Sequence, residues 1–208
     1  MTKLCFCLPV FLLFASSFAH GQDTPNGGWY AFHPNQEIRV HPLPLLKARS
    51  KDLSDVLLTS LDILFHDRTI CCGRDSALED AAQSADPLSL KNIASKLQGR
   101  HLLSDGRSIR VTAELWTPSQ GDISYQIVSA LINQHTMLIV WDSHLYVLDG
   151  AIFDQTAYSD GTSMNVIHKL LLLDTRYFDS RRQIVFNRDT DDFGKVQGML
   201  LLLAAAPQ

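Results

Sequence analysis

The sequence predicts a single α+β domain in which helices come first and a mainly antiparallel sheet follows. Between residues 50 and 134 apolar residues mostly recur every three or four positions, the spacing of amphipathic helices. After residue 135 they instead form short apolar or alternating runs, which are typical of strands. Helices and strands that are segregated along the chain favour an α+β fold over an alternating α/β fold.

Residues 1–21 are predicted to be a secretory signal peptide. Lys3 supplies a positive start, Leu4–Ala15 is an apolar run, and Ala19-His20-Gly21 has the small residues of a cleavage site. The run is shorter than the roughly 20 apolar residues that a membrane-spanning helix needs. We therefore expect a secreted or periplasmic protein without a stable membrane anchor, an uncleaved anchor being the alternative.

Residues 22–49 are expected to form an irregular, partly extended lead-in, because they contain Asn26-Gly27-Gly28 and prolines and have little periodicity. The domain proper then runs over residues 50–208. Its third helix is the clearest, since Asp86 can cap it, Pro87 suits its first position and Gly99 can end it. Helices are predicted over 50–65, 77–85, 87–98 and 122–134.

Strands account for most of the remaining chain. Strand-like pieces lie within 101–117, and further strands are predicted over 136–141, 145–153, 166–173, 183–187 and 199–206. The strands 145–153 and 166–173 are expected to pair as an antiparallel hairpin. The midpoint between them lies near residue 159, within Tyr158-Ser159-Asp160-Gly161, which has the residue types of a turn.

Two adjacent cysteines, Cys71 and Cys72, are the most informative residues of the domain. The other two cysteines, Cys5 and Cys7, lie in the predicted signal peptide. An adjacent pair cannot link distant parts of a chain, which excludes a disulfide scaffold. Cys72 precedes a predicted helix, and a helix N-terminus lowers the pKa of a thiol. The alternatives are a buried structural thiol, a vicinal disulfide, and Cys71 as the nucleophile.

His144 and Asp174 complete a nucleophilic arrangement. In the predicted hairpin His144 starts one strand and Asp174 ends the other, so both would emerge at the same end of the sheet. An imidazole there can accept the thiol proton, and a carboxylate can orient the imidazole. The alternatives are that His144 is a polar turn residue and that Asp174 forms an ion pair with one of the following arginines, Arg176, Arg181 or Arg182.

Taken together, these residues resemble the papain-like cysteine peptidases, and within them the branch typified by the bacteriocin-processing peptidases. The shared features are Cys72-Gly73 opening a helix, the sequence HLYVLDG over 144–150, and Asp174 ending the next strand. The resemblance covers about residues 60–180. It implies a papain-like fold, in which N-terminal helices, with the nucleophile at a helix start, pack on the antiparallel sheet.

The resemblance also implies roles. Cys72 would be the nucleophile, His144 the base and Asp174 the orienting acid. The family usually has a Gln six positions before the Cys, and here that position is His66. His66 would donate a hydrogen bond to the oxyanion together with the Cys72 N–H. The ordinary alternative is that His66 is simply a histidine at the end of a helix. The implied activity is cleavage of a peptide or isopeptide bond in a peptide or protein substrate, without a cofactor. The alternatives are a non-catalytic binding or structural domain of the cell envelope and a thiol-dependent deamidase or acyl transferase.

Charge and motifs argue against several other classes. A net charge of −4 and a pI near 6.0 argue against nucleic acid as a partner, because nucleic acid needs a basic face. A calcium loop over 189–194 fails at Phe193, and Leu200 stands where the bidentate Glu should be. A zinc site built from the two adjacent cysteines, His66 and His144 lacks the usual ligand spacing. We therefore expect no metal.

Overall fold

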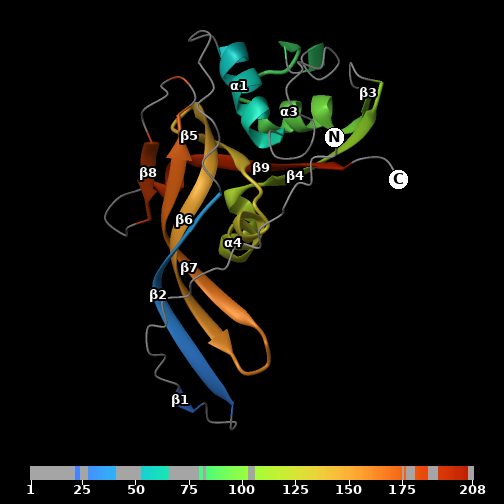
Figure 1. Cartoon of the computed structure of the whole chain (residues 1–208). Helices are drawn as coiled ribbons and strands as arrows, with labels where there is room; N and C mark the ends of the chain where they lie inside the picture. Colours follow the sequence, from blue (N-terminus) through green and yellow to red (C-terminus); the bar gives the residue numbers. More distant parts are fainter. Residues whose placement is uncertain are drawn as a thin grey trace, which may run out of the picture.

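The computed structural model of the chain describes residues 22–23, 28–40, 53–65, 80–81, 83–102, 106–174, 176, 181–186 and 192–205. The fold is α+β, with a few short helices and an open antiparallel sheet, as the sequence predicts (Figure 1). The predicted site residues Cys72 and His66, the alternative nucleophile Cys71 and the predicted signal peptide up to residue 21 lie outside the described residues. None of the helices described is long and apolar enough to cross a membrane.

Of the predicted helix over 77–85, residues 80, 81 and 83 are helical, and residues 77–79 and 82 lie outside the described residues. The other three helices lie close to their predicted positions. They are α1 (Leu53–Phe65), α3 (Leu90–Leu97) and α4 (Ser124–Ile132), with short 3-10 turns at Pro118–Gln120 and Phe193–Lys195. The strands are β1 (Gln22–Asp23), β2 (Trp29–Arg39), β3 (Gly99–Leu102), β4 (Ser108–Trp116), β5 (Met137–Trp141), β6 (His144–Tyr158), β7 (Ser163–Leu173), β8 (Arg181–Val185) and β9 (Val196–Ala205).

The long strand β6 organises the sheet. The strand order is β1-β2-β6-β5-β9-β4-β3, with β7 on the other side of β6 and β8 beyond β7, and every pairing is antiparallel. The first part of β6, His144–Leu148, pairs with β5, and the part from Gly150 to Tyr158 pairs with β2 on the same edge. Figure 1 shows the ribbon of β2, β6 and β7 extending away from α1 and α3.

The β6–β7 hairpin confirms the pairing that the sequence predicts. Its register runs from Val147 opposite Leu173 to Ala157 opposite Ser163. The turn is closed by the Tyr158 N–H, which donates to the Thr162 carbonyl at 2.9 Å, and Gly161 has a φ of 84°. The Asp160 carboxylate accepts hydrogen bonds from the N–H and the hydroxyl of Thr162 at 2.8 and 2.6 Å. Asp and Gly therefore supply the turn chemistry expected of them.

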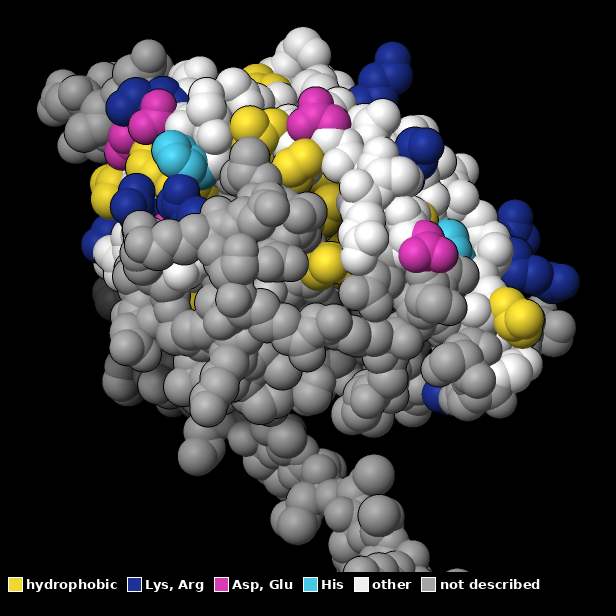
Figure 2. All heavy atoms as spheres, turned by 90° about the horizontal axis from the view of Figure 1, so that it is seen from above, with side chains coloured by type: hydrophobic (Ala, Val, Ile, Leu, Met, Phe, Trp, Pro, Cys, Tyr) yellow, Lys and Arg dark blue, Asp and Glu magenta, His cyan; other side chains and the backbone are white. Residues whose placement is uncertain are grey.

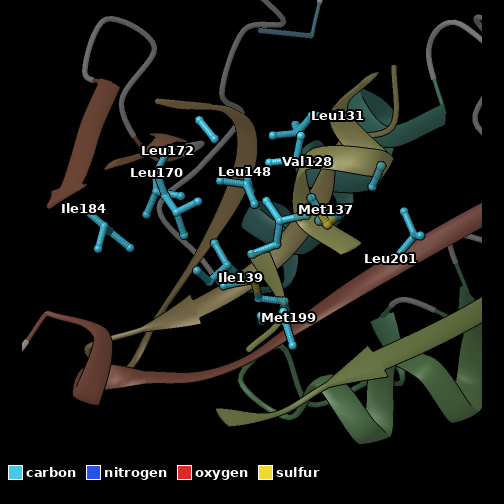
Figure 3. Packing of buried hydrophobic residues seen from close by; sticks show 14 of the residues in the cluster. Val128, Leu131, Met137, Ile139, Leu148, Leu170, Leu172, Ile184, Met199 and Leu201 are labelled. Atoms are coloured by element: carbon cyan, nitrogen blue, oxygen red, sulfur yellow. The ribbon is translucent and has the colours of Figure 1, made fainter. Parts of the chain in front are cut away.

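Two hydrophobic clusters lie on the two faces of the sheet. On one face α1 and α3 pack against Leu145 and Val147 of β6, and on the other face α4 packs against Tyr146 and Leu148. Figure 3 shows the second cluster, in which side chains of α4, β5, β6, β7, β8 and β9 meet, among them Val128, Leu131, Met137, Ile139, Leu148, Leu172, Ile184 and Met199. The side chains of successive β6 residues thus point to opposite faces of the sheet, as the pleat of a strand requires.

The predicted lead-in over residues 22–49 is extended, as expected in part, but more regular than expected, because residues 29–39 form the strand β2. Residues 24–27 and 41–49 of this range lie outside the described residues. β2 pairs with β6 from Tyr30 to Arg39, with a bulge between His33 and Gln36. Pro34 falls inside that bulge, where its missing N–H interrupts no ladder hydrogen bond. Most side chains of β2 are exposed or half-buried. The backbone ladder therefore holds the strand without an apolar pattern that could reveal it.

The start of α3 also differs from the prediction. Asp86 does not cap the helix; its carboxylate accepts a hydrogen bond from the Leu88 N–H at 3.1 Å and so forms a preceding turn. The N-cap is Ser89, whose hydroxyl accepts from the Asn92 N–H at 3.3 Å. The helix therefore begins at Leu90, three residues beyond Pro87, because Ser89, three positions after Asp86, takes the capping role.

Gly150 lies where β2 takes over from β5 along β6, and its substitution is expected to disrupt that junction. A Cβ at this position would lie 2.6 Å from the Ile38 carbonyl oxygen and 3.0 Å from Cδ1 of Leu171. Because the first of these atoms belongs to the backbone, β2 must shift away. We expect Gly150→Ala to lower the free energy of unfolding by about 1–3 kcal/mol, measured by urea denaturation.

The matched control is Gly198→Ala in β9, where the nearest atom to the added Cβ would be the Trp116 carbonyl oxygen at 3.2 Å. This contact is less severe, so the loss should be smaller than at Gly150. Equal losses for the two variants would contradict the explanation by close approach of β2.

Candidate functional site

The two described residues of the predicted site lie at the same end of the sheet. Leu173 lies opposite Val147, so continuing the register by one residue places Asp174 opposite Tyr146. His144 is two residues before Tyr146 on β6 and therefore on the same face of the strand. In Figure 2, which shows the molecule from above, basic, acidic and histidine side chains gather at the left.

His144 is held in place by the tight turn that joins β5 to β6. Trp141 pairs with His144, and the two residues between them, Asp142 and Ser143, have φ values of 49° and 59°. Positive φ at both central residues is what a type I′ hairpin turn requires. The Nδ1 atom of His144 lies 2.7 Å from the Asp142 carbonyl oxygen. A carbonyl only accepts, so Nδ1 donates this hydrogen bond, and in the neutral imidazole Nε2 then carries the lone pair.

Asp174 is fully buried and is paired with Arg176. Its oxygens accept hydrogen bonds from Nη2 of Arg176 at 2.7 Å and from Nε at 2.9 Å, and the Arg176 backbone N–H adds a third at 3.1 Å. Burial alone would raise the pKa of Asp174. The hydrogen bonds from Arg176 and the positive charges of Arg176 and Arg182 outweigh burial and hold that pKa below its usual value.

Tyr146 lies next to both arginines and to His144. Its side chain is completely buried, and its hydroxyl oxygen lies 3.5 Å from Nη2 of Arg176 and 3.4 Å from Nη1 of Arg182. The Arg176 guanidinium lies over the ring at 5.7 Å from its centroid, and the His144 ring centroid lies 6.3 Å from that of Tyr146. We call His144, Tyr146, Asp174, Arg176 and Arg182 the Tyr146 cluster.

Within the described part of the chain, no hydrogen bond joins His144 to Asp174. The imidazole is bound to its own turn carbonyl, and the carboxylate is bound to Arg176. The ion pair that the sequence offered as an alternative for Asp174 is therefore present, whereas His144 is not a turn residue but the first residue of β6, paired with Trp141 directly after the turn. The pairing of Cys72 with His144 and the oxyanion role of His66 lie outside the described residues and stay predictions.

Tyr146 and Arg176 were not predicted as site residues. Tyr146 belongs to the apolar alternation of β6, so its sequence pattern is that of a core residue. Arg176 was foreseen only as a competitor for Asp174, because it is two residues away. What could have pointed to both as site residues is their position in the sequence, since each lies two residues from His144 or Asp174 at the end of the predicted hairpin.

No group of three or more His, Cys, Asp or Glu side chains suited to a metal ion occurs among the residues that the structure describes. Comparisons with protein families, with curated proteins and with solved structures each give no match.

Proposed function

We propose that the chain is an exported, papain-like thiol hydrolase that cleaves a peptide or isopeptide bond, with Cys72 as the nucleophile and His144 as the base. The observation that supports this is the imidazole of His144, which the Asp142 carbonyl holds at 2.7 Å in the tautomer that leaves Nε2 free to accept a proton. A backbone carbonyl thus orients the base in the way that a carboxylate does in other hydrolases.

In this mechanism Nε2 of His144 takes the proton from the Cys72 thiol, and the thiolate attacks the carbonyl carbon of the substrate. The Cys72 N–H and His66 stabilise the oxyanion that forms. As the C–N bond breaks, the protonated His144 gives its proton to the leaving amine, and water then hydrolyses the thioester to restore the thiol. Asp174 acts here as a positioning residue, because it fixes Arg176 against Tyr146.

The test is alkylation of the mildly reduced protein with iodoacetamide from pH 4 to pH 9, with the labelled site assigned by mass spectrometry. A thiol activated by His144 should be labelled well below the ordinary thiol pKa of about 8.5. At pH 6 we expect His144→Ala to slow labelling of Cys72 about tenfold, because less of the thiol is ionised without the imidazole. The effect is no larger because a thiolate of lowered pKa is also a weaker nucleophile.

The matched control is His101→Ala on β3, whose Nε2 also lies 2.7 Å from a backbone carbonyl, that of Leu97. It should leave the labelling rate of Cys72 unchanged. Labelling of Cys72 only near pH 8.5, with no effect of His144→Ala, would overturn the proposal.

A second candidate function is a non-catalytic binding domain of the cell envelope. The observation that favours it is the engagement of both Asp174 oxygens by Arg176, which leaves His144 without a carboxylate partner among the described residues. An unreactive Cys72 in the same labelling experiment would favour this function. If Cys72 is reactive, product analysis separates hydrolysis from deamidation or acyl transfer, because deamidation releases ammonia.

A further inference from the structure

The Tyr146 cluster carries more positive than negative charge. Arg176 and Arg182 each carry one positive charge, and Asp174 is the only carboxylate that the described residues place against them. Arg176 uses both oxygens of that carboxylate, and its side chain is only 16% exposed. Both Asp174 oxygens are thus bound by Arg176, and Arg182 has only the longer contact from its Nε to that carboxylate.

Arg182 is the guanidinium that remains accessible. Its Nε lies 3.8 Å from the Asp174 carboxylate, beyond hydrogen-bond distance, and its Nη1 reaches the Tyr146 hydroxyl only at 3.4 Å. Its side chain is 52% exposed. A guanidinium carries five N–H donors in a planar fork that matches a carboxylate, so most of the donors of Arg182 are open to a ligand.

Arg182 lies close enough to His144 to contact a substrate of the proposed reaction. The Tyr146 hydroxyl contacts Arg182, and the Tyr146 ring centroid lies 6.3 Å from that of His144. An extended peptide spans about 3.3 Å per residue, so a group bound to Arg182 lies within about four residues of the base.

We propose that Arg182 binds a carboxylate of the peptide substrate, close to the bond that is cleaved. This inference rests on the proposed function, since it assigns a substrate class to the same site. The carboxylate belongs either to the C-terminus of the peptide or to an acidic side chain, because both present the same two oxygens to the guanidinium fork. The neutral amide of the same peptide lacks the charge and is bound less tightly.

The experiment measures binding of three probe peptides at low salt: acetyl-Ala-Ala-Ala with a free carboxylate, the same peptide as its C-terminal amide, and acetyl-Ala-Asp-Ala amide. Binding is followed by NMR on the Nε–H of Arg182. We expect at least one carboxylate peptide to bind about fivefold more tightly than the neutral amide, as a partly exposed, bidentate pair allows. Whichever carboxylate peptide binds better identifies the source of the charge.

Substitutions of Arg182 decide whether that residue is responsible. Arg182→Gln should abolish the preference, and Arg182→Lys should keep part of it, because lysine retains the charge without the fork. The matched control is Arg110→Gln, an exposed arginine on β4 with the same change of charge, which should leave the preference intact. No preference in the wild type, or a preference that survives Arg182→Gln, would overturn the inference. Binding needs no reactive thiol, so its failure is distinguishable from failure of Cys72 to be alkylated.

Discussion

Replacing Asp174 with alanine is expected to lower the free energy of unfolding by about 3 kcal/mol or more, measured by urea or guanidinium denaturation. The substitution removes the fully buried carboxylate, and with it the ion pair and the two side-chain hydrogen bonds that Arg176, which is 16% exposed, makes with Asp174. Breaking a buried pair by removing one partner typically costs about 3–5 kcal/mol, because the remaining charge stays buried and uncompensated. Asp174→Asn should cost less, since the amide oxygen still accepts one hydrogen bond from Arg176.

The effect of Asp174 should also depend on pH in a defined direction. The pKa of Asp174 in the folded protein lies below its usual value, because the hydrogen bonds and charges of the arginines outweigh burial. A carboxyl group whose folded pKa is lowered stabilises the fold fully above its unfolded pKa, about 3.9. This stabilisation is lost as the pH falls through the folded pKa. The difference in stability between wild type and Asp174→Asn should therefore shrink below about pH 4.

The control for Asp174 is Asp142→Asn in the exposed turn between β5 and β6. The backbone carbonyl of Asp142, not its side chain, holds His144, and asparagine suits the positive φ of this position. We expect it to change the stability by less than about 0.5 kcal/mol, as is usual for surface positions. A loss at Asp174→Asn that stays constant from pH 7 to pH 3 would contradict the ionic explanation.

Replacing Tyr146 with alanine is expected to lower the free energy of unfolding by about 4 kcal/mol. Its side chain is completely buried in the cluster between α4 and the sheet, with Trp141 at a centroid distance of 5.9 Å. Removing a buried aromatic ring typically costs about 3–5 kcal/mol, through lost burial and the cavity that is left. Arg176 would also lose the ring over which its guanidinium lies.

Tyr146→Phe separates the contribution of the ring from that of the hydroxyl group. The ring stays in place, and only the hydrogen bonds from the arginines at 3.4 and 3.5 Å are lost, so we expect a cost of about 1 kcal/mol. Tyr125→Ala on α4, where the side chain is 60% exposed, is the control and should change the stability by less than about 0.5 kcal/mol. If Tyr146→Phe were as costly as Tyr146→Ala, the hydroxyl and not the packing would be responsible.

Strands with a buried apolar pattern were predicted well. Met137–Trp141 and the β6–β7 pair are rich in Val, Ile and Leu. Consecutive residues in the central parts of these strands are buried, so the strands are covered on both faces of the sheet. The pairing of the hairpin followed from two local signals, the apolar strands and the turn residues midway between them, whereas its register, which shifts at two places, did not. Such features are predictable because burial and turn chemistry are both encoded close to the residues they affect.

β2 could not be predicted in the same way. Its stability comes from backbone hydrogen bonds to β6, a strand more than a hundred positions away in the sequence, and its side chains are mostly exposed or half-buried. A ladder of backbone groups leaves no mark on the choice of side chains. The same limit applies to the capping of α3, where Asp86 and Ser89 have similar capping propensities and the structure has Ser89 as the cap and Asp86 in the preceding turn.

The sequence by itself determined that the fold is α+β and that His144 and Asp174 lie at one end of an antiparallel hairpin. Both follow from the local spacing of apolar and turn residues. Only the tertiary structure decided which groups these two side chains bind. The Asp174 carboxylate pairs with Arg176, and His144 is held by its own turn carbonyl, because hydrogen-bond donors and acceptors compete through space, over distances of a few ångströms. The buried ring of Tyr146 lies beneath the guanidinium of Arg176 in this arrangement.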